Sequence, residues 1–154
     1  MKRKHAKPVA AVYDRRPKRG PKSSARTERR FNTLIAAAKA VQKNAHAPYS
    51  KFRVGAALLA KNGKVYTGVN VENASYGLTN CAERGALGKA VSDGQRKFAA
   101  IAVVAPSSTL SPCGACRQAL AEFGDMVVVC ADSRNLRKQR VYRVSELLPH
   151  AFKL

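Results

Sequence analysis

The apolar positions of this chain follow two periods, one typical of helices and one typical of strands. From about Thr27 the apolar side chains recur at helical spacing, which predicts a first helix that ends before Pro48. The apolar face of this helix consists of Phe31, Leu34, Ile35, Ala38 and Val41.

Two strands are predicted next, over residues 52–60 and 64–71, and the Asn62-Gly63 pair between them is a typical hairpin turn. A second helix is predicted from Cys81 to about Ser92, with Thr79 or Asn80 as its N-cap. The pattern then predicts a strand over 99–105, a helix over 117–123, strands over 126–131 and 140–144, and a short helix over 145–148. Because helices and strands alternate and the strands are mostly apolar throughout, we expect an α/β sandwich with helices covering a central sheet.

Composition adds a domain boundary to this pattern. Hydrophobic residues make up 45% of the 154, which suits one folded domain, and no apolar run is as long as a membrane span. The net charge is +20, and residues 1–30 carry half of it, with twelve Lys and Arg against two acids. Residues 1–26 are therefore predicted to be a basic, disordered tail, and residues 27–154 to be the folded domain.

Three interpretations of the tail stay open. It is most simply a solvated extension without a specific function. Its charge also suits non-specific contact with a polyanion such as RNA or DNA. A mitochondrial presequence is less favoured, because Pro17 and Pro21 would interrupt a long amphipathic helix.

Candidate chemistry is concentrated in two short segments. Cys81-Ala82-Glu83-Arg84 is followed 32 residues later by Cys113-Gly114-Ala115-Cys116. The two segments supply three thiols, and three protein ligands leave a tetrahedral zinc one open corner for water, which is typical of a catalytic site. Thiolate ligands need reduced sulfur, so we expect a cytoplasmic location.

Glu83 is better suited to moving protons than to binding the metal, because Cys81 already holds its segment there. A carboxylate that reaches both water and substrate can act as general acid and base, and the zinc-dependent base deaminases are the known enzymes with this donor set. Either Arg84 or Arg117 could donate to a ligand sulfur and so offset its negative charge. Cys130 ends an apolar run and is expected to be a buried core thiol.

Five stretches of the chain, in family order and spacing, resemble the small homotetrameric cytidine deaminases that bind zinc through three cysteines. These stretches are 47–57, 68–76, 80–84, 111–118 and 146–152. The resemblance implies a three-layer α-β-α sandwich with a central mixed five-stranded sheet, one Zn²⁺ per subunit and a homotetramer. It also implies hydrolytic deamination of cytidine and 2′-deoxycytidine to uridine and 2′-deoxyuridine, with release of ammonia, in pyrimidine salvage.

The resemblance also implies roles for single residues. Cys81, Cys113 and Cys116 would bind zinc, and Glu83 would be the catalytic acid and base. Asn70 and Glu72 would bind the ribose 3′ hydroxyl, Phe52 would pack against the pyrimidine ring, and Phe152 would reach the base pocket of a neighbouring subunit. The implied substrate-binding set is Phe52, Asn70, Glu72, Tyr76, Ala82 and Phe152. Taken singly, the two Phe side chains could also be core or interface aromatics, and Asn70 could merely shape a turn.

Glu72 favours a free nucleoside over a polynucleotide. A carboxylate at the 3′ hydroxyl would repel the next phosphate of a polynucleotide chain. Two positions depart from the family pattern, since Gly85 stands where a side chain is common and His150 where Gly is common. These departures bear on local packing and substrate fit, but they remove no catalytic group.

Three other functions compete with this one. The enzyme could deaminate a modified cytidine or a nucleoside antibiotic such as blasticidin. The chain could be a zinc-binding nucleic-acid module, although a structural zinc would need a fourth ligand, and Cys130 would have to leave its strand to serve. A dithiol oxidoreductase built on Cys113 and Cys116 would leave Cys81 and Glu83 without a role.

Overall fold

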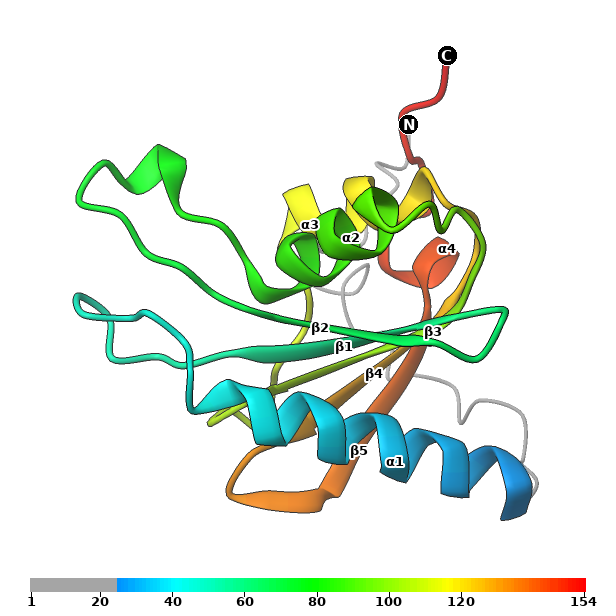
Figure 1. Ribbon diagram of the computed structural model, residues 1–154, viewed down its shortest axis with the longest axis horizontal. Helices are drawn as coiled ribbons and strands as arrows, with labels where there is room; N and C mark the ends of the chain where they lie inside the picture. Colours follow the sequence, from blue (N-terminus) through cyan, green and yellow to red (C-terminus); the bar gives the residue numbers. More distant parts are fainter. Residues whose placement is uncertain (1–24) are drawn as a thin grey trace, which may run out of the picture.

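The computed structural model describes residues 25–154, which form a five-stranded sheet with helices on both faces (Figure 1). The predicted tail over 1–26 lies almost entirely outside the described residues. In chain order the elements are α1 (Ala25–Gln42), β1 (Gly55–Ala60), β2 (Val65–Val69), the 3₁₀ helix η2 (Tyr76–Leu78), α2 (Ala82–Ser92), β3 (Phe98–Ala105), α3 (Gly114–Ala121), β4 (Val127–Asp132), β5 (Asn135–Arg143) and α4 (Val144–Leu147).

The strands lie in the order β2-β1-β3-β4-β5. Only β3 and β4 are parallel, and the other neighbouring pairs are antiparallel, so the sheet is mixed. Helix α1 covers one face, and α2, α3 and α4 cover the other (Figure 1). The predicted three-layer α-β-α sandwich with a mixed five-stranded sheet is therefore confirmed.

The central strands are buried on both faces, which explains their continuous apolar sequences. In β3, Ile101 and Val103 join the core beneath α2 and α3, whereas Ala102 and Val104 join the core against α1. β1 and β4 alternate in the same way, because successive side chains of a strand point to opposite faces. On the α1 side, Ile35 contributes one of the largest fully buried side chains.

One glycine sets how closely α2 approaches the sheet. A Cβ on Gly68 of β2 would overlap the main-chain atoms of Ala82 and Ala86 in α2. Gly85 faces the same contact from the helix, but a Cβ there would lie 3.5 Å from the Val69 oxygen, which is ordinary van der Waals contact. A Cβ at Gly85 would therefore fit, and Gly68 is the one of these two glycines that the packing of α2 requires.

Several boundaries differ from the prediction. Cys81 occupies the N-cap position of α2 without a side-chain hydrogen bond to the helix. The proposed caps Thr79 and Asn80 are wrong, because the main chain of Asn80 pairs with Val71 in an isolated bridge. β5 begins at Asn135 rather than at 140, since an edge strand exposed along most of its length tolerates its basic side chains. η2 was not expected from the apolar pattern.

Two Gly→Ala substitutions test this packing by thermal or chemical unfolding. Gly68→Ala should lower the free energy of unfolding by about 1–3 kcal/mol or more, because the new methyl group meets main chain that cannot move aside. Gly88→Ala is the matched control in the interior of α2, where nothing lies within 4 Å of an added Cβ. It should raise the free energy of unfolding by up to about 1 kcal/mol through helix propensity. Equal effects of the two changes would contradict the close contact.

Candidate metal centre and substrate site

Three cysteine thiols meet where two helices begin. Cys81 is the N-cap of α2, Cys113 is the N-cap of α3, and Cys116 lies in the first turn of α3. The sulfur atoms of Cys81 and Cys113 are 3.7 Å apart, and all three sulfurs lie within 4.8 Å of one another. The fold thus brings together the three thiols that the sequence singles out.

The donor set fits a zinc ion. Two sulfurs that each lie 2.3 Å from a tetrahedral zinc are about 3.8 Å apart, which is close to the 3.7 Å between Cys81 and Cys113. Soft thiolates are typical zinc ligands, and three of them leave the fourth position open. None of the four cysteines forms a disulfide. Cys130 lies outside the cluster as a buried thiol of β4, so the fourth ligand needed for a structural zinc is missing among residues 25–154.

The surroundings favour a thiolate at Cys81. The Cys116 thiol donates a hydrogen bond that lowers the pKa of Cys81 to about 5, and Cys113 and Arg84 act in the same direction. The pKa of Cys116 is raised, first by that same hydrogen bond and then by burial. Unpaired N–H groups at the starts of α2 and α3 also stabilise negative sulfur.

Arg84 compensates charge at this centre. Burial opposes its charge, but the three neighbouring thiols outweigh this and raise the pKa of its guanidinium. Its Nη2 donates to the Thr79 carbonyl at 2.9 Å, and its buried Nε has no hydrogen-bond partner within residues 25–154. The side chain therefore brings a positive charge beside a cluster that becomes negative when it binds metal.

Arg117 forms hydrogen bonds with the loop that precedes Cys113 and with α4. Its Nε donates to the Pro112 carbonyl at 2.8 Å and its Nη2 to the Ser111 hydroxyl at 2.7 Å, in the loop that precedes Cys113. Its Nη1 donates to the Leu147 carbonyl of α4 at 2.9 Å. These hydrogen bonds hold the ligand loop against α4 and use three of the five N–H groups of the guanidinium.

Glu83 lies beside the thiols in the first turn of α2 and is only 5% exposed. Burial raises the pKa of its carboxyl group, and the negative charge of Cys81 raises it further. A carboxyl group whose pKa moves toward neutrality can both accept and donate a proton near physiological pH.

Asn70 and Glu72 both hold the loop that precedes β1. The Asn70 side chain donates to the Phe52 carbonyl at 2.9 Å and accepts from the Val54 amide at 2.8 Å. An amide group has two donor hydrogens and two acceptor lone pairs, so each end retains one for a ligand. Asn70 therefore shapes this loop and still has capacity to bind a ligand.

Glu72 is held as an ionised carboxylate. It accepts hydrogen bonds from the hydroxyl group of Ser50 and from the main-chain amides of Tyr49, at 3.0 Å, and Ser50, at 3.2 Å. The Ser50 hydroxyl is the largest cause of its lowered pKa. The loop that precedes β1 and the loop that follows β2 carry these groups, and both project from the same end of the sheet (Figure 1).

The aromatic members of the predicted set are exposed. The side chains of Tyr76 and Phe152 are 77% and 70% exposed, and Phe52 is at 37%. The Tyr76 ring makes an edge contact with Tyr49, their centroids 6.3 Å apart. Ala82, by contrast, is fully buried in the core at the start of α2.

Sequence reasoning gave no role to two residues that the structure connects to this site. Ser50 binds Glu72, and Gln118 pairs with the main chain of Phe152. Both lie inside stretches that resemble the family, but their partners are 22 and 34 residues away. The resemblance marked these segments without indicating which segments they contact.

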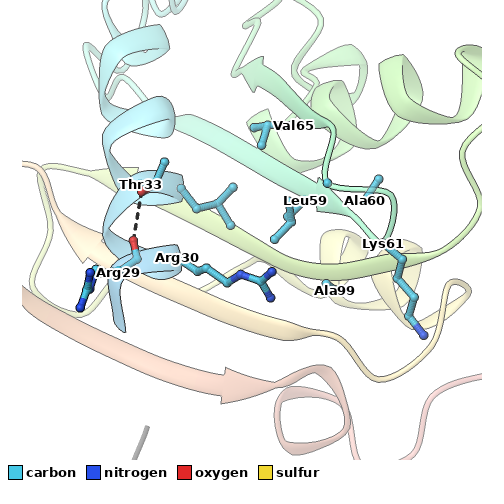
Figure 2. Close-up of a pocket in the computed structure, with 10 residues that line it drawn as sticks. Arg29, Arg30, Thr33, Leu59, Ala60, Lys61, Val65 and Ala99 are labelled. Carbon is cyan, nitrogen blue, oxygen red and sulfur yellow. Dashed lines mark hydrogen bonds between the residues drawn. The ribbon is translucent and has the colours of Figure 1, made fainter. Parts of the chain in front are cut away.

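A cavity of about 800 Å³ lies elsewhere, between α1 and the β1–β2 hairpin (Figure 2). Basic side chains, among them Arg30 and Lys61, lie around an aliphatic lining. The lining contains no thiol, carboxylate or imidazole. This cavity therefore offers none of the acid–base or metal-binding groups found at the cysteine cluster.

Comparisons with known proteins agree with the site. The family described as "Cytidine and deoxycytidylate deaminase zinc-binding region" matches residues 29–132. The chain belongs to the cytidine deaminase family. A cytidine deaminase of Sporosarcina psychrophila is 52% identical over 122 residues, covering 77% of this chain and 88% of the relative. A crystal structure of cytidine deaminase from Burkholderia pseudomallei superposes with a TM-score of 0.72 at 51% identity, covering 79% of this chain and 98% of that one.

These findings establish the enzyme class and its metal. The chain is an enzyme of hydrolytic cytidine deamination, and Zn²⁺ is its cofactor, as the family match and the three-thiol cluster together show. A blasticidin-S deaminase of Bacillus cereus is a more distant relative, 34% identical over 110 residues, which cover 65% of this chain and 76% of that protein. No helix within residues 25–154 is long and apolar enough to cross a membrane.

Two cysteine substitutions test the metal centre. Cys116→Ala should remove zinc from the purified protein, because two thiols bind the ion far more weakly than three. Cys130→Ala is the matched control, since it also deletes a buried thiol and should keep one zinc per chain. Mass spectrometry of the purified variants measures the zinc bound per chain. Full zinc in the Cys116 variant would exclude that residue as a ligand.

Proposed function

We propose that the chain deaminates free cytidine and 2′-deoxycytidine to uridine and 2′-deoxyuridine in pyrimidine salvage, with zinc held by Cys81, Cys113 and Cys116. The observation that carries this proposal is the meeting of three thiols with a buried carboxyl group, Glu83, at the start of α2. Open zinc coordination with an adjacent general acid and base is what hydrolysis at a ring carbon requires.

Zinc, when bound, supplies the Lewis acidity that activates water for attack at C4. Glu83 would take a proton from the attacking water and deliver it to the ring nitrogen next to C4. It would then carry the proton of the new C4 hydroxyl group to the amino group, which leaves as ammonia. Its raised pKa suits both steps, because the same group must accept and donate at one pH. Arg84 balances the charge of the thiolates, and Arg117 holds the loop that carries Cys113.

Asn70 and Glu72 are proposed to bind the ribose 3′ hydroxyl. Hydrogen bonds from Ser50 and Tyr49 fix the direction of the Glu72 carboxylate and keep it ionised at neutral pH. Both residues address the 3′ side, so ribose and deoxyribose satisfy them equally. The carboxylate would repel a 3′ phosphate, which favours a free nucleoside over a nucleic acid.

We further propose a cytoplasmic homotetramer in which Phe52 packs against the pyrimidine ring and Phe152 enters the base pocket of a neighbouring copy. Support comes from large apolar side chains that are exposed in the single chain, among them Tyr76, Leu78 and Phe152, at 77%, 71% and 70%. Burying them between copies removes apolar surface from water. Reduced thiols are typical of cytoplasmic proteins. We also propose that the basic tail makes non-specific contact with polyanions.

Glu83→Gln tests the mechanism. This variant should retain one zinc per chain and the thermal stability of the parent, and its kcat for cytidine should fall by about 10²–10⁴-fold or more, because the amide cannot transfer the proton. Loss of the cytosine absorbance band measures the rate. Glu122→Gln is the control, since it removes an exposed carboxylate at the end of α3 and should keep the parent rate. A near-normal rate in the Glu83 variant would remove Glu83 from the mechanism.

Glu72→Gln tests substrate choice. The parent should prefer cytidine over cytidine 3′-phosphate in kcat/KM, and the variant should lose about 10–100-fold on cytidine, the worth of a hydrogen bond to a charged group. The loss in kcat/KM should be smaller for cytidine 3′-phosphate than for cytidine. The substitution removes the hydrogen bond to the 3′ position, but it also removes the repulsion between the Glu72 carboxylate and the 3′ phosphate. A preference that stays the same in the variant would contradict a role of Glu72 at the 3′ position.

A further inference from the structure

We propose that Gln118 is a positioning residue, which fixes the main chain of Phe152 so that its ring is presented to the active site of a second copy of this chain. This inference rests on the proposed function of Phe152 at a neighbouring site. It concerns a different residue, whose contacts lie entirely within one chain.

The contact is a two-point pairing between a side chain and the main chain. The Oε1 atom of Gln118 accepts from the Phe152 amide at 3.0 Å, and its Nε2 donates to the Phe152 carbonyl at 2.9 Å. A carboxamide can do both at once, whereas a carboxylate can only accept and a thioether such as Met does neither well. The pairing satisfies both polar main-chain groups of Phe152 and thereby fixes the direction in which its side chain leaves the chain.

The same helix holds the chain at two points. Arg117 donates to the Leu147 carbonyl at 2.9 Å, and the next residue, Gln118, holds Phe152. Within residues 25–154, no other side chain or main-chain group forms a hydrogen bond with the segment that follows Leu148. Helix α3 also carries Cys113 at its N-cap and Cys116 in its first turn, so the candidate metal centre and the C-terminal segment share one support.

The ring that this pairing positions is not enclosed by residues 25–154. Phe152 is 70% exposed although its main chain is fixed. A large aromatic ring held in water is unfavourable for an isolated chain, and it is a preorganised anchor for a partner. The C-terminal segment, drawn in red, leaves the molecule on the side of α3 and α4 (Figure 1). Because α2 and α3 form the candidate metal centre on this same face, a second copy is the partner that the segment fits.

Amide hydrogen exchange of the zinc-loaded full chain tests the pairing directly. In Gln118→Met the Phe152 amide should exchange about 5- to 10-fold faster than in the parent, because its acceptor is lost. Gln139→Met is the matched control, since it also removes two side-chain amide hydrogen bonds, at a distant edge of the sheet. It should leave exchange at Phe152 unchanged. Unchanged exchange in the Gln118 variant would overturn the proposal.

Kinetics then test whether the pairing serves the substrate site. Gln118→Met should raise KM for cytidine about 3- to 10-fold with kcat and zinc content preserved, because the ring must be ordered at each binding event. Gln118→Glu, which keeps the acceptor and loses the donor, should give a smaller rise. Gln139→Met should keep the parent KM.

A double-mutant cycle separates positioning from general stability. Phe152→Ala should raise KM, and adding Gln118→Met should raise it no further, because the first change already removes the ring that Gln118 positions. Additive effects would mean that Gln118 acts independently of Phe152, and they would overturn the proposal. If Phe152→Ala leaves KM unchanged, the proposed role of Phe152 fails, and that result is distinct from unchanged hydrogen exchange in the Gln118 variant.

Discussion

The site depends on one geometric constraint, which is that α2 and α3 must begin at the same point above the sheet. Cys81 and Cys113 are the N-caps of these helices, so the positions of their sulfur atoms follow from where each helix starts. Gly68 lets α2 lie directly on β2, and Arg117 holds the loop before α3 against α4. A shift of either helix would separate the thiols and leave the metal without its third ligand.

Charge at this point is balanced by several groups, because three thiolates and a divalent ion carry a net negative charge. Unpaired amides at the two helix starts offset part of it, and the Arg84 guanidinium offsets more. Glu83 is then a carboxyl group kept out of water beside negative sulfur, and both conditions raise its pKa. The arrangement that suits metal binding therefore also raises the pKa of the proposed proton carrier.

Asn70 and Glu72, the proposed ribose-binding residues, also shape the loops that carry them. The Asn70 side chain forms hydrogen bonds with the main chain of Phe52 and Val54, which lie just before β1. Glu72 accepts hydrogen bonds from the main-chain amides of Tyr49 and Ser50. These contacts fix the loop before any ligand arrives, which lowers the ordering needed on binding. The first strand begins at Gly55 instead of 52 because the segment before it is held by Asn70 rather than by a neighbouring strand.

The sequence by itself determined the order of helices and strands, the two-faced burial of the central strands and the identity of the three thiols and Glu83. Each of these follows from local periodicity or from the chemistry of a short segment. Tertiary structure alone decided that Cys81 takes the N-cap position of α2, that Gly68 rather than Gly85 permits the close packing, and that Arg117 and Gln118 bind the main chain of Leu147 and Phe152. The physical reason is that these features are contacts between residues far apart in the chain, for example 30 positions from Arg117 to Leu147 and 34 from Gln118 to Phe152. Their partners are set by how the elements pack, which no local pattern encodes.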